Sequence, residues 1–245
     1  MLGRFRDVIV TITRHRQDPE DVAKGVHMID ALGALFGRGD RTMVGRMRAS
    51  EQGRRILAAR KSVLDVLADR PRLRTLPEGT LGRAYAHFAD DNQLFPEELA
   101  EAVIEARAAT GGQVPGATPE LAFLQDRYRD LHDIWHVVTG YGTDLAGEYG
   151  IVALQSKQVG YRAMAITGFL STLMTSIAQR RFDLIGTWFE GRRRGRRGAY
   201  LLAEDWESLL EQPLAEVQAK LGFEKPPVYR PFDYEKSVEA PAQAA

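Results

Sequence analysis

Apolar residues recur at helical spacing along most of the chain, and this pattern predicts an all-α fold. In the first such segment, Val22, Val26 and Ile29 follow residues 18–20, where an aspartate cap, a proline and a glutamate are typical of a helix start. Glycines within residues 37–40 end the pattern. The sequence has no alternating segments joined by hairpin turns, so it predicts no strand pairs.

Prolines, glycines and capping residues divide the rest of the chain into further predicted helices. The clearest loop covers residues 110–116, and residues 192–197, five of which are arginine, are expected to form a basic connector. The predicted helices span residues 50–69, ending before Pro71; residues 80–88, with Thr80 as the cap; residues 96–109; residues 118–138; a segment from about Asp144 that carries Glu148; residues 157–180; and residues 206–221.

The same signals divide the chain into three regions. Residues 71–225 are expected to form one multi-helix, bundle-like domain, and residues 1–70 a loosely attached N-terminal helical extension that can pack on it. Residues 226–245 begin with two prolines and end in Ala-Pro-Ala-Gln-Ala-Ala, so they are expected to form a partly disordered tail. With 245 residues, 44% of them hydrophobic, the chain is long enough to bury a large core without disulfides.

The composition narrows the chemistry. The chain has no cysteine, which excludes disulfides and thiolate metal sites, so any metal must be held by nitrogen and oxygen ligands. Lysine plus arginine number 33, as do aspartate plus glutamate, and this balance argues against nucleic acid as a partner. No run of about 18 uncharged apolar residues is present, so no membrane span is predicted and the protein is expected to be soluble or peripheral.

The N-terminal residues are not expected to form a secretory signal, because no long apolar stretch precedes Gln17. Four arginines before that residue give some likeness to a mitochondrial presequence, but serine is missing and a basic first strand or helix is the favoured interpretation. A short N-terminus of this kind suits a bacterium, where the protein would lie at the cytoplasmic face of the membrane. In a eukaryote, the expected place is the matrix side of the mitochondrial inner membrane.

One segment carries recognisable metal chemistry. His132 and His136 are four residues apart, so on a helix they share one face, about 6 Å apart along the axis, and can chelate one ion. Asp133 can share their face and ligate the ion or orient an imidazole. Two glycines that follow break the helix, so Glu148 can return on the next helix and complete a set of four nitrogen and oxygen ligands.

A histidine pair at this spacing is also common at surfaces and helix caps, and His15, His27 and His87 are assigned to such roles. For His132 and His136 the metal site is favoured, because their helix is otherwise lined by apolar residues, and a histidine pair with two acids in that setting requires a cation. The spacing is similar to that of zinc hydrolases, but with aspartate beside the first histidine in place of a glutamate base.

The four residues just described match in full the pattern His-Asp-x-x-His followed by eleven residues and Glu. This pattern resembles the signature of the coenzyme Q (ubiquinone) biosynthesis family that includes mitochondrial coenzyme Q assembly protein four. Residues 76–92 resemble the segment that precedes the motif in that family, and residues 206–214 also look similar. The resemblance covers about residues 75–225.

The resemblance implies an all-helical fold and a divalent metal at the motif, zinc above all, with iron or cobalt left open. It further implies work on the prenylated benzoate ring of ubiquinone precursors, in which the carboxyl at ring carbon C1 is replaced by a hydroxyl. In that reaction the metal would act as a Lewis acid, and Asp133 or Glu148 as the catalytic base. The implied partners are a polyprenylated quinone precursor, other quinone-biosynthesis enzymes and the membrane surface.

A polyprenyl substrate needs an apolar groove near a membrane. Residues 164–178 carry no charge and are rich in small residues, although a tightly packed core helix is the favoured interpretation for most of them. The arginine run can attract anionic headgroups, and Trp188 and Phe189 beside it suit a membrane interface, but a solvated connector is equally consistent with it. The candidate lipid contacts are Met164, Gly168, Ser171, Arg192, Arg193 and Arg194.

Three functions stay open at this point. The first is an enzyme that performs metal-dependent C1 decarboxylation and hydroxylation in ubiquinone synthesis. The second is a non-catalytic, lipid-binding scaffold that organises a quinone-biosynthesis complex around a structural metal. The third is an unrelated metallohydrolase. The sequence leaves the oligomeric state open, a homodimer included.

Overall fold

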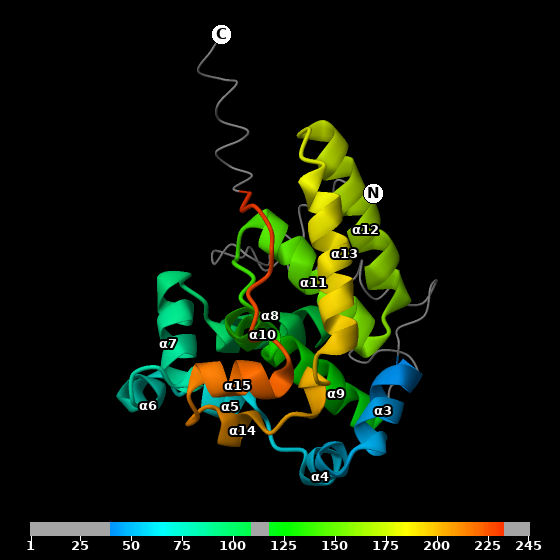
Figure 1. Cartoon of the computed structure of the whole chain (residues 1–245). Coiled ribbons are helices and arrows are strands. Elements are labelled where there is room, and N and C mark those ends of the chain that lie inside the picture. Colours follow the sequence, from blue (N-terminus) through cyan, green and yellow to red (C-terminus); the bar gives the residue numbers. More distant parts are fainter. Residues whose placement is uncertain (1–39, 109–117, 233–245) are drawn as a thin grey trace.

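The computed structural model describes residues 40–108 and 118–232. In these ranges the chain forms thirteen α-helices and one short 3-10 helix (Figure 1) and no β-strand, which confirms the all-α prediction. The helix predicted from residue 18 and the loop at residues 110–116 lie outside the described residues. The elements are α3 Asp40–Ala49, α4 Glu51–Ala59, α5 Leu64–Leu67, α6 Arg70–Thr75, α7 Leu81–Asp91, α8 Pro96–Ala108, α9 Pro119–Asp130, α10 His132–Thr139, α11 Leu145–Val159, α12 Arg162–Ala178, α13 Asp183–Arg197, η1 Leu201–Ala203, α14 Trp206–Leu209 and α15 Leu214–Leu221.

Helix α11 is the central element and packs against α10, α12 and α13. It carries few polar side chains, and all of its residues except Lys157 are at least partly buried. Its backbone touches that of α13: a Cβ atom added at Gly191 would lie 2.2 Å from the carbonyl oxygen of Gly150, and one added at Gly195 would lie 2.5 Å from that of Leu154. Glycine is therefore required on α13, and this close crossing fixes where α11 can lie.

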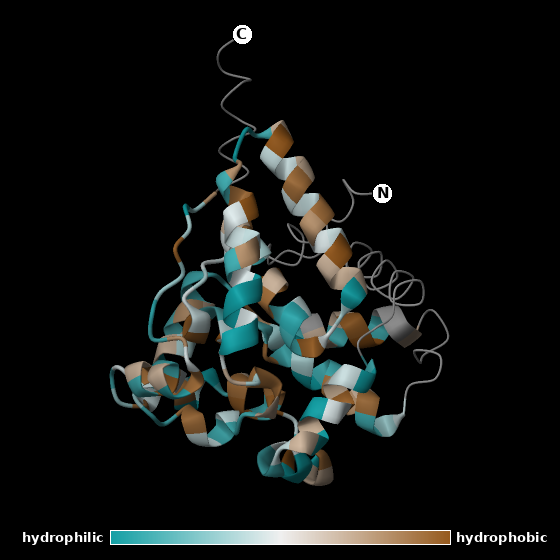
Figure 2. Ribbon diagram, turned by 45° about the vertical axis from the view of Figure 1, so that its right-hand side comes forward, coloured by the Kyte–Doolittle hydropathy of each residue, from teal (hydrophilic) through white to brown (hydrophobic). Residues whose placement is uncertain are grey.

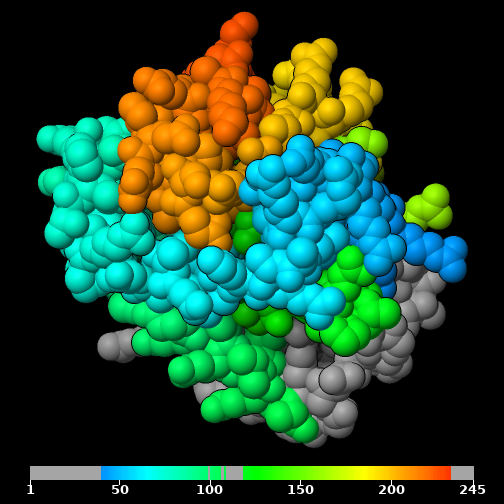
Figure 3. Space-filling model, turned by 90° about the horizontal axis from the view of Figure 1, so that it is seen from below, coloured from blue at the N-terminus to red at the C-terminus, as the bar shows by residue number. Residues whose placement is uncertain are grey.

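Helices α3 and α4 lie beneath the domain in the view of Figure 1 and share its core. Met43 and Met47 are buried within the same hydrophobic cluster as the central helices. Arg46 donates a hydrogen bond of 2.7 Å to the carbonyl oxygen of Gln158, and its guanidinium group lies over the ring of Tyr200. Seen from below, these blue segments lie against the orange C-terminal elements (Figure 3). The described residues before Arg70 are thus packed into the main core.

The structure corrects several predicted helix boundaries. Pro71 lies in the first turn of α6, capped by Asp69, because proline fits a position whose N–H has no helical partner. The helix predicted over 118–138 is two helices that meet at Leu131, and the last predicted helix is two helices separated before Pro213. The expected basic connector at residues 192–197 is wrong, because these residues continue α13, as the high helix propensity of arginine allows.

The chain after α15 returns over the turn between α10 and α11, as the red segment of Figure 1 shows. The Tyr229 hydroxyl accepts a hydrogen bond from the Gly142 N–H (2.8 Å) and donates one to the Asp144 carboxylate (3.0 Å). The backbone N–H of Phe232 donates to the same carboxylate (2.7 Å). Residues 226–232, which we expected to belong to the tail, therefore brace this turn.

We expect Gly191→Ala to lower the free energy of unfolding by about 2–3 kcal/mol, because the added methyl group overpacks the contact between α11 and α13. Gly186→Ala, on the same helix, is the matched control: a Cβ there meets nothing within 4 Å, so that variant should gain about 0.5–1 kcal/mol. Urea unfolding followed by circular dichroism measures both values. Equal stabilities for the two variants would contradict a backbone contact at Gly191.

Candidate metal centre

A helix–turn–helix unit brings the motif residues together. His132 and His136 lie one turn apart on α10, which ends at Gly140 in the left-handed region, with φ of 76°. Asp144 then caps α11 by accepting hydrogen bonds from two backbone N–H groups of its first turn. Glu148 follows in that first turn, so its carboxylate returns to the histidines on α10.

Three side chains form a compact group of ligand atoms. The Nε2 atoms of His132 and His136 lie 3.2 Å apart. The Glu148 carboxylate lies 3.3 Å from the Nε2 atom of His136 and 3.7 Å from that of His132. His136 and Glu148 are buried, whereas 21% of the His132 side chain is exposed. The group is therefore reached from solvent on the side of His132.

The spacing of these atoms fits a single divalent ion. Two ligand atoms bound at ~2.05 Å to one tetrahedral ion are separated by about 3.3 Å. The two Nε2 atoms are 3.2 Å apart, and each lies near one carboxylate oxygen of Glu148, at 3.3 Å (Oε1, from His136) and 3.7 Å (Oε2, from His132), close to that value. Two imidazoles and a carboxylate suit zinc, and iron and cobalt use the same ligands. With three protein ligands, a tetrahedral ion keeps one position for water or a substrate.

The expected fourth ligand, Asp133, is not part of this group. Because it follows His132 directly, it is turned by about 100° around the helix axis. Burial raises the pKa of Tyr85 on α7, and the negative charge of Asp133 raises it further. The structure therefore brings together three of the four predicted ligands and leaves Asp133 beside them, partly exposed.

The cluster favours an ionised carboxylate. Burial alone would raise the pKa of Glu148, but the charge of His136 and hydrogen bonds from both histidines outweigh it and lower that pKa to about 2. Burial would likewise lower the pKa of His132, but the hydrogen bond and charge of Glu148 raise it above its usual value of 6.5. In the absence of an ion, Glu148 and His132 therefore stabilise each other's charged forms.

Neighbouring groups orient His136. Its Nδ1 atom lies 3.1 Å from the carbonyl oxygen of Tyr141, which can only accept, so Nδ1 carries a proton and Nε2 is the atom that faces the site. Phe88 of α7 stacks on the ring at 5.8 Å. Nothing in the sequence indicates the role of Tyr141. Gln155, by contrast, lies 2.9 Å from His132, and its place two turns after Glu148 on the same face of α11 is a pattern from which its position near the site could have been predicted.

The predicted lipid contacts on α12 lie mostly inside the protein. A Cβ atom at Gly168 would lie 2.6 Å from the ring of Trp188, and the Ser171 hydroxyl lies 3.1 Å from the hydroxyl of Tyr149. Both positions thus agree with the packed-core interpretation. Met164 is half-buried, with its sulfur 3.4 Å from the Tyr128 hydroxyl.

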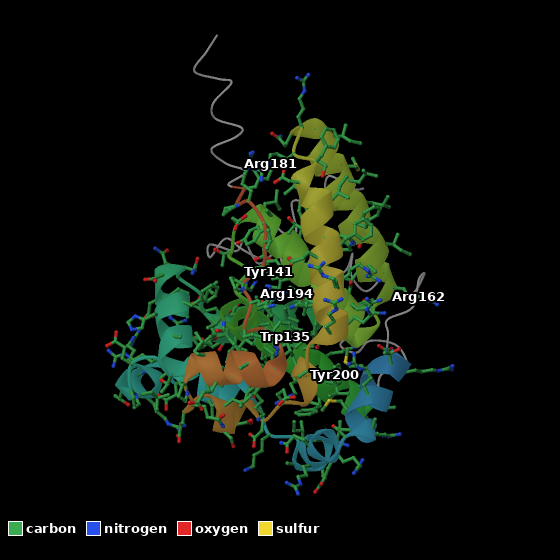
Figure 4. The ribbon with its side chains drawn as sticks, viewed as in Figure 1. Trp135, Tyr141, Arg162, Arg181, Arg194 and Tyr200 are labelled. Carbon is green, nitrogen blue, oxygen red and sulfur yellow. The ribbon has the colours of Figure 1, made fainter. Side chains whose placement is uncertain are left out.

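The three arginines predicted to contact lipid differ in exposure. Arg194 is buried, donates a hydrogen bond of 2.7 Å to the carbonyl oxygen of Thr139, and lies over the ring of Tyr141. Figure 4 shows it within the domain beside Tyr141. Assigning Arg194 to lipid headgroups is therefore wrong, because its guanidinium group faces the core. Arg192 donates to Ser156 and is half-buried, whereas Arg193 is exposed.

The fold and site together define a class: an all-helical protein whose candidate metal centre is built from a histidine pair on one helix and a glutamate on the next. Comparison with known proteins identifies the family to which the chain belongs. The family model described as "Coenzyme Q (ubiquinone) biosynthesis protein Coq4" matches residues 23–227, a range that contains all of the motif. The chain therefore belongs to the Coq4 family, which confirms the resemblance. The match also extends to residue 23, well before the expected start near residue 75.

Relatives support this membership. A mitochondrial ubiquinone biosynthesis protein COQ4 homologue from Danio rerio is 29% identical over 206 residues, which cover 82% of this chain and 70% of the homologue. The homologue from Bos taurus is 30% identical over 205 residues, covering 82% and 72%. A crystal structure of a candidate ubiquinone biosynthesis protein from Nostoc punctiforme has a TM-score of 0.57 at 22% identity, covering 89% of this chain and 96% of that one. That similarity concerns the fold.

We expect the protein to bind one zinc ion. His136→Ala should weaken zinc binding by more than about 100-fold, because it removes a ligand, and the loss of a residue that only hydrogen-bonds to a ligand would cost less. Because the pKa of His132 is raised, a proton competes with the ion, and affinity should fall by up to about tenfold per unit as the pH drops through that pKa. Glu148, with a pKa of about 2, adds no such dependence near neutral pH.

Calorimetry with a competing chelator, between about pH 6 and about pH 8, measures this affinity. The exposed His87 on α7 supplies the control, since His87→Ala should bind zinc like the wild type. Equal losses in the His87 and His136 variants, or an affinity that does not change with pH, would contradict the assigned site.

Proposed function

We propose that this protein catalyses metal-dependent oxidative decarboxylation of a polyprenylated benzoate precursor in ubiquinone biosynthesis, replacing the C1 carboxyl by a hydroxyl. The observation that carries the proposal is the convergence of His132, His136 and Glu148 at the spacing of one ion, with coordination left open. Membership of the Coq4 family supports the pathway.

The reaction needs an oxidant and a reductant. One dioxygen, two protons and two electrons convert the ring carboxylic acid into the phenol, carbon dioxide and water. The electrons come from an external two-electron donor, which other quinone-biosynthesis enzymes supply. A bound divalent ion supplies Lewis-acid binding of the ring carboxylate or the neighbouring phenolate, and iron or cobalt would add redox chemistry.

The chain's own residues have distinct tasks. His132, His136 and Glu148 hold the ion, and the wall formed by Phe88 over His136 excludes water from one side. The base role falls to Asp133, because Glu148 is engaged by both histidines whereas Asp133 lies outside the ligand group and is partly exposed. At that position the Asp133 carboxylate accepts the proton of the ring hydroxyl.

The outer face of α12 is the part of the described structure best suited to a membrane. Ile166, Leu170, Met174 and Ile177 are exposed and follow a helical spacing of 4, 4 and 3 residues, and Figure 2 shows brown residues along this helix. No helix among the described residues is long and apolar enough to cross a bilayer.

Charge supports the same placement. Helix α12 contains no acidic residue, and the exposed Arg162 begins it; Arg181, in the turn after its other end, is paired with Asp183 (Figure 4). We name the four exposed apolar residues the α12 stripe. The stripe rests on the surface of an anionic membrane, at the cytoplasmic face in a bacterium or the matrix side of the inner membrane in mitochondria, and admits the polyprenyl tail from there.

The α12 stripe also favours a second candidate function. A non-catalytic scaffold would use such a face to hold lipid or partners, with the metal in a structural role. The incomplete coordination set argues for the enzyme, and a variant that loses the metal but keeps the fold separates the two.

Cells that lack this gene should accumulate a prenylated ring that keeps its C1 carboxyl, as measured by a mass-spectrometric quinone profile. Wild type and His87→Ala should restore the profile, whereas His136→Ala should not, because it removes a ligand. Rescue by His136→Ala at equal protein level would favour the scaffold. An unchanged quinone pool would overturn the pathway assignment, and turnover of phosphate or ester substrates by purified protein would revive a hydrolase.

Replacing Ile166, Leu170 and Met174 together by glutamine should abolish most binding to vesicles of mixed phosphatidylcholine and phosphatidylglycerol in a flotation assay. The apolar area that inserts is lost while the buried face of α12 is untouched. Ile104→Gln, at a more exposed isoleucine on α8, should float like wild type. If the wild type itself stays with the soluble fraction, a protein partner and not the membrane covers the stripe.

A further inference from the structure

One turn joins the two helices that carry the candidate ligands, and a tyrosine from the chain after α15 holds this turn at two points. The Tyr229 hydroxyl accepts a hydrogen bond from the Gly142 N–H at 2.8 Å and donates one to Oδ2 of Asp144 at 3.0 Å. The centroid of the Tyr229 ring lies 5.6 Å from that of the Tyr141 ring, so the side chain rests on the turn itself. Each of the two hydrogen bonds leads to a different ligand.

The first hydrogen bond fixes a peptide plane. The Gly142 N–H belongs to the same peptide unit as the Tyr141 carbonyl, whose oxygen lies 3.1 Å from Nδ1 of His136. A trans peptide unit is planar, with its C=O and N–H pointing in opposite directions, and no peptide bond of the described residues is cis. Holding the N–H against Tyr229 therefore holds the carbonyl against the ring of His136.

Glycine at position 142 makes this anchor necessary. A peptide plane beside a glycine can turn over at little cost, because glycine adopts conformations that other residues avoid. Glycine is also what admits the hydroxyl: a Cβ atom at position 142 would lie 2.9 Å from the Tyr229 oxygen and 3.0 Å from Oδ2 of Asp144. The residue that lets Tyr229 approach is thus the one that would otherwise leave the plane free to turn.

The second hydrogen bond leads to the glutamate ligand. Asp144 caps α11 through Oδ1, which accepts from the N–H groups of Ala146 and Gly147. Because Tyr229 binds Oδ2, the carboxylate cannot rotate away from the helix without losing that bond. Glu148 lies in the first turn that this cap holds, and its own N–H donates to the carbonyl of Asp144 at 2.9 Å. The cap therefore determines where the Glu148 side chain begins.

We propose that Tyr229 is a positioning residue of the metal centre, whose hydroxyl fixes both the carbonyl that orients His136 and the cap that places Glu148. The inference rests on the metal site of the proposed function. Tyr229 is not one of the candidate ligands, and it acts on them through residues 141–144.

Zinc affinity tests this role. Tyr229→Phe removes only the hydroxyl and should weaken zinc binding by about tenfold, the lower end of the loss that follows removal of a group that orients a ligand. Tyr200→Phe is the matched control: Tyr200 is also partly buried, and its hydroxyl donates to the carbonyl of Met43 at 3.4 Å, so this variant should bind zinc like the wild type. Chelator competition measures the affinities, and urea unfolding of the metal-free proteins measures their stabilities.

Gly142→Ala disturbs the same contact from the side of the turn, because the added Cβ atom displaces the Tyr229 hydroxyl. It should weaken zinc binding in the wild-type background and add little to the loss in Tyr229→Phe, since two changes that remove one contact are not additive. Fully additive losses would mean that the two residues act independently and would contradict the proposal.

The visible spectrum of the cobalt-substituted protein supplies a readout that a loss of stability alone would not change, because it reports the geometry of the ligands around the ion. Tyr229→Phe should shift or weaken the wild-type bands, and Tyr200→Phe should leave them unaltered. Wild-type affinity and an unaltered spectrum in Tyr229→Phe would overturn the positioning role alone and leave the proposed function standing. Failure of the wild type to bind zinc or cobalt would overturn the metal site, and the role of Tyr229 with it.

Discussion

The buried carboxylate of Glu148 is the constraint on which the rest of the structure depends. Only 3% of this residue is exposed, and an unpaired charge at such a place would cost roughly several kcal/mol. The imidazoles of His132 and His136 compensate it, and they can do so because a glycine turn reverses the chain between α10 and α11. The backbone contact of α11 with α13 and the chain segment that braces the turn hold this geometry in place.

The position of Asp133 leaves the group of candidate ligands with three members. Structural zinc sites are closed by four protein ligands, whereas catalytic sites keep a position open. Asp133 is the one further acid in the motif, and it lies outside that group, although its charge contributes to the raised pKa of Tyr85. A side chain that could have been a fourth ligand is thus not part of the group.

The sequence predicted the helical class, and it singled out the three side chains that come together as a group able to hold a metal ion, because both depend on local spacing. Residues four apart share a helix face in any context, and the glycines after His136 give a reliable stop. The predictions from the sequence failed where tertiary packing determines the direction of a side chain or the end of a helix. The inward direction of Arg194 depends on the carbonyl of Thr139 and the ring of Tyr141, and the interruption at Leu131 carries no proline or glycine. Domain boundaries remain a prediction.

Helix α12 has the reverse polarity of an ordinary surface helix, with polar residues on its inner face and apolar residues on its outer face. Its inner face is polar: Thr167, Thr172 and Ser176 donate to the carbonyl four residues earlier, which satisfies each hydroxyl without a partner on another helix. The outer face carries the α12 stripe. A helix that places hydroxyls inside and isoleucine outside is stable where its outer surroundings are apolar. Met164 of the same helix contacts Tyr128, which bonds to Gln155, so hydrogen bonds connect α12 with His132.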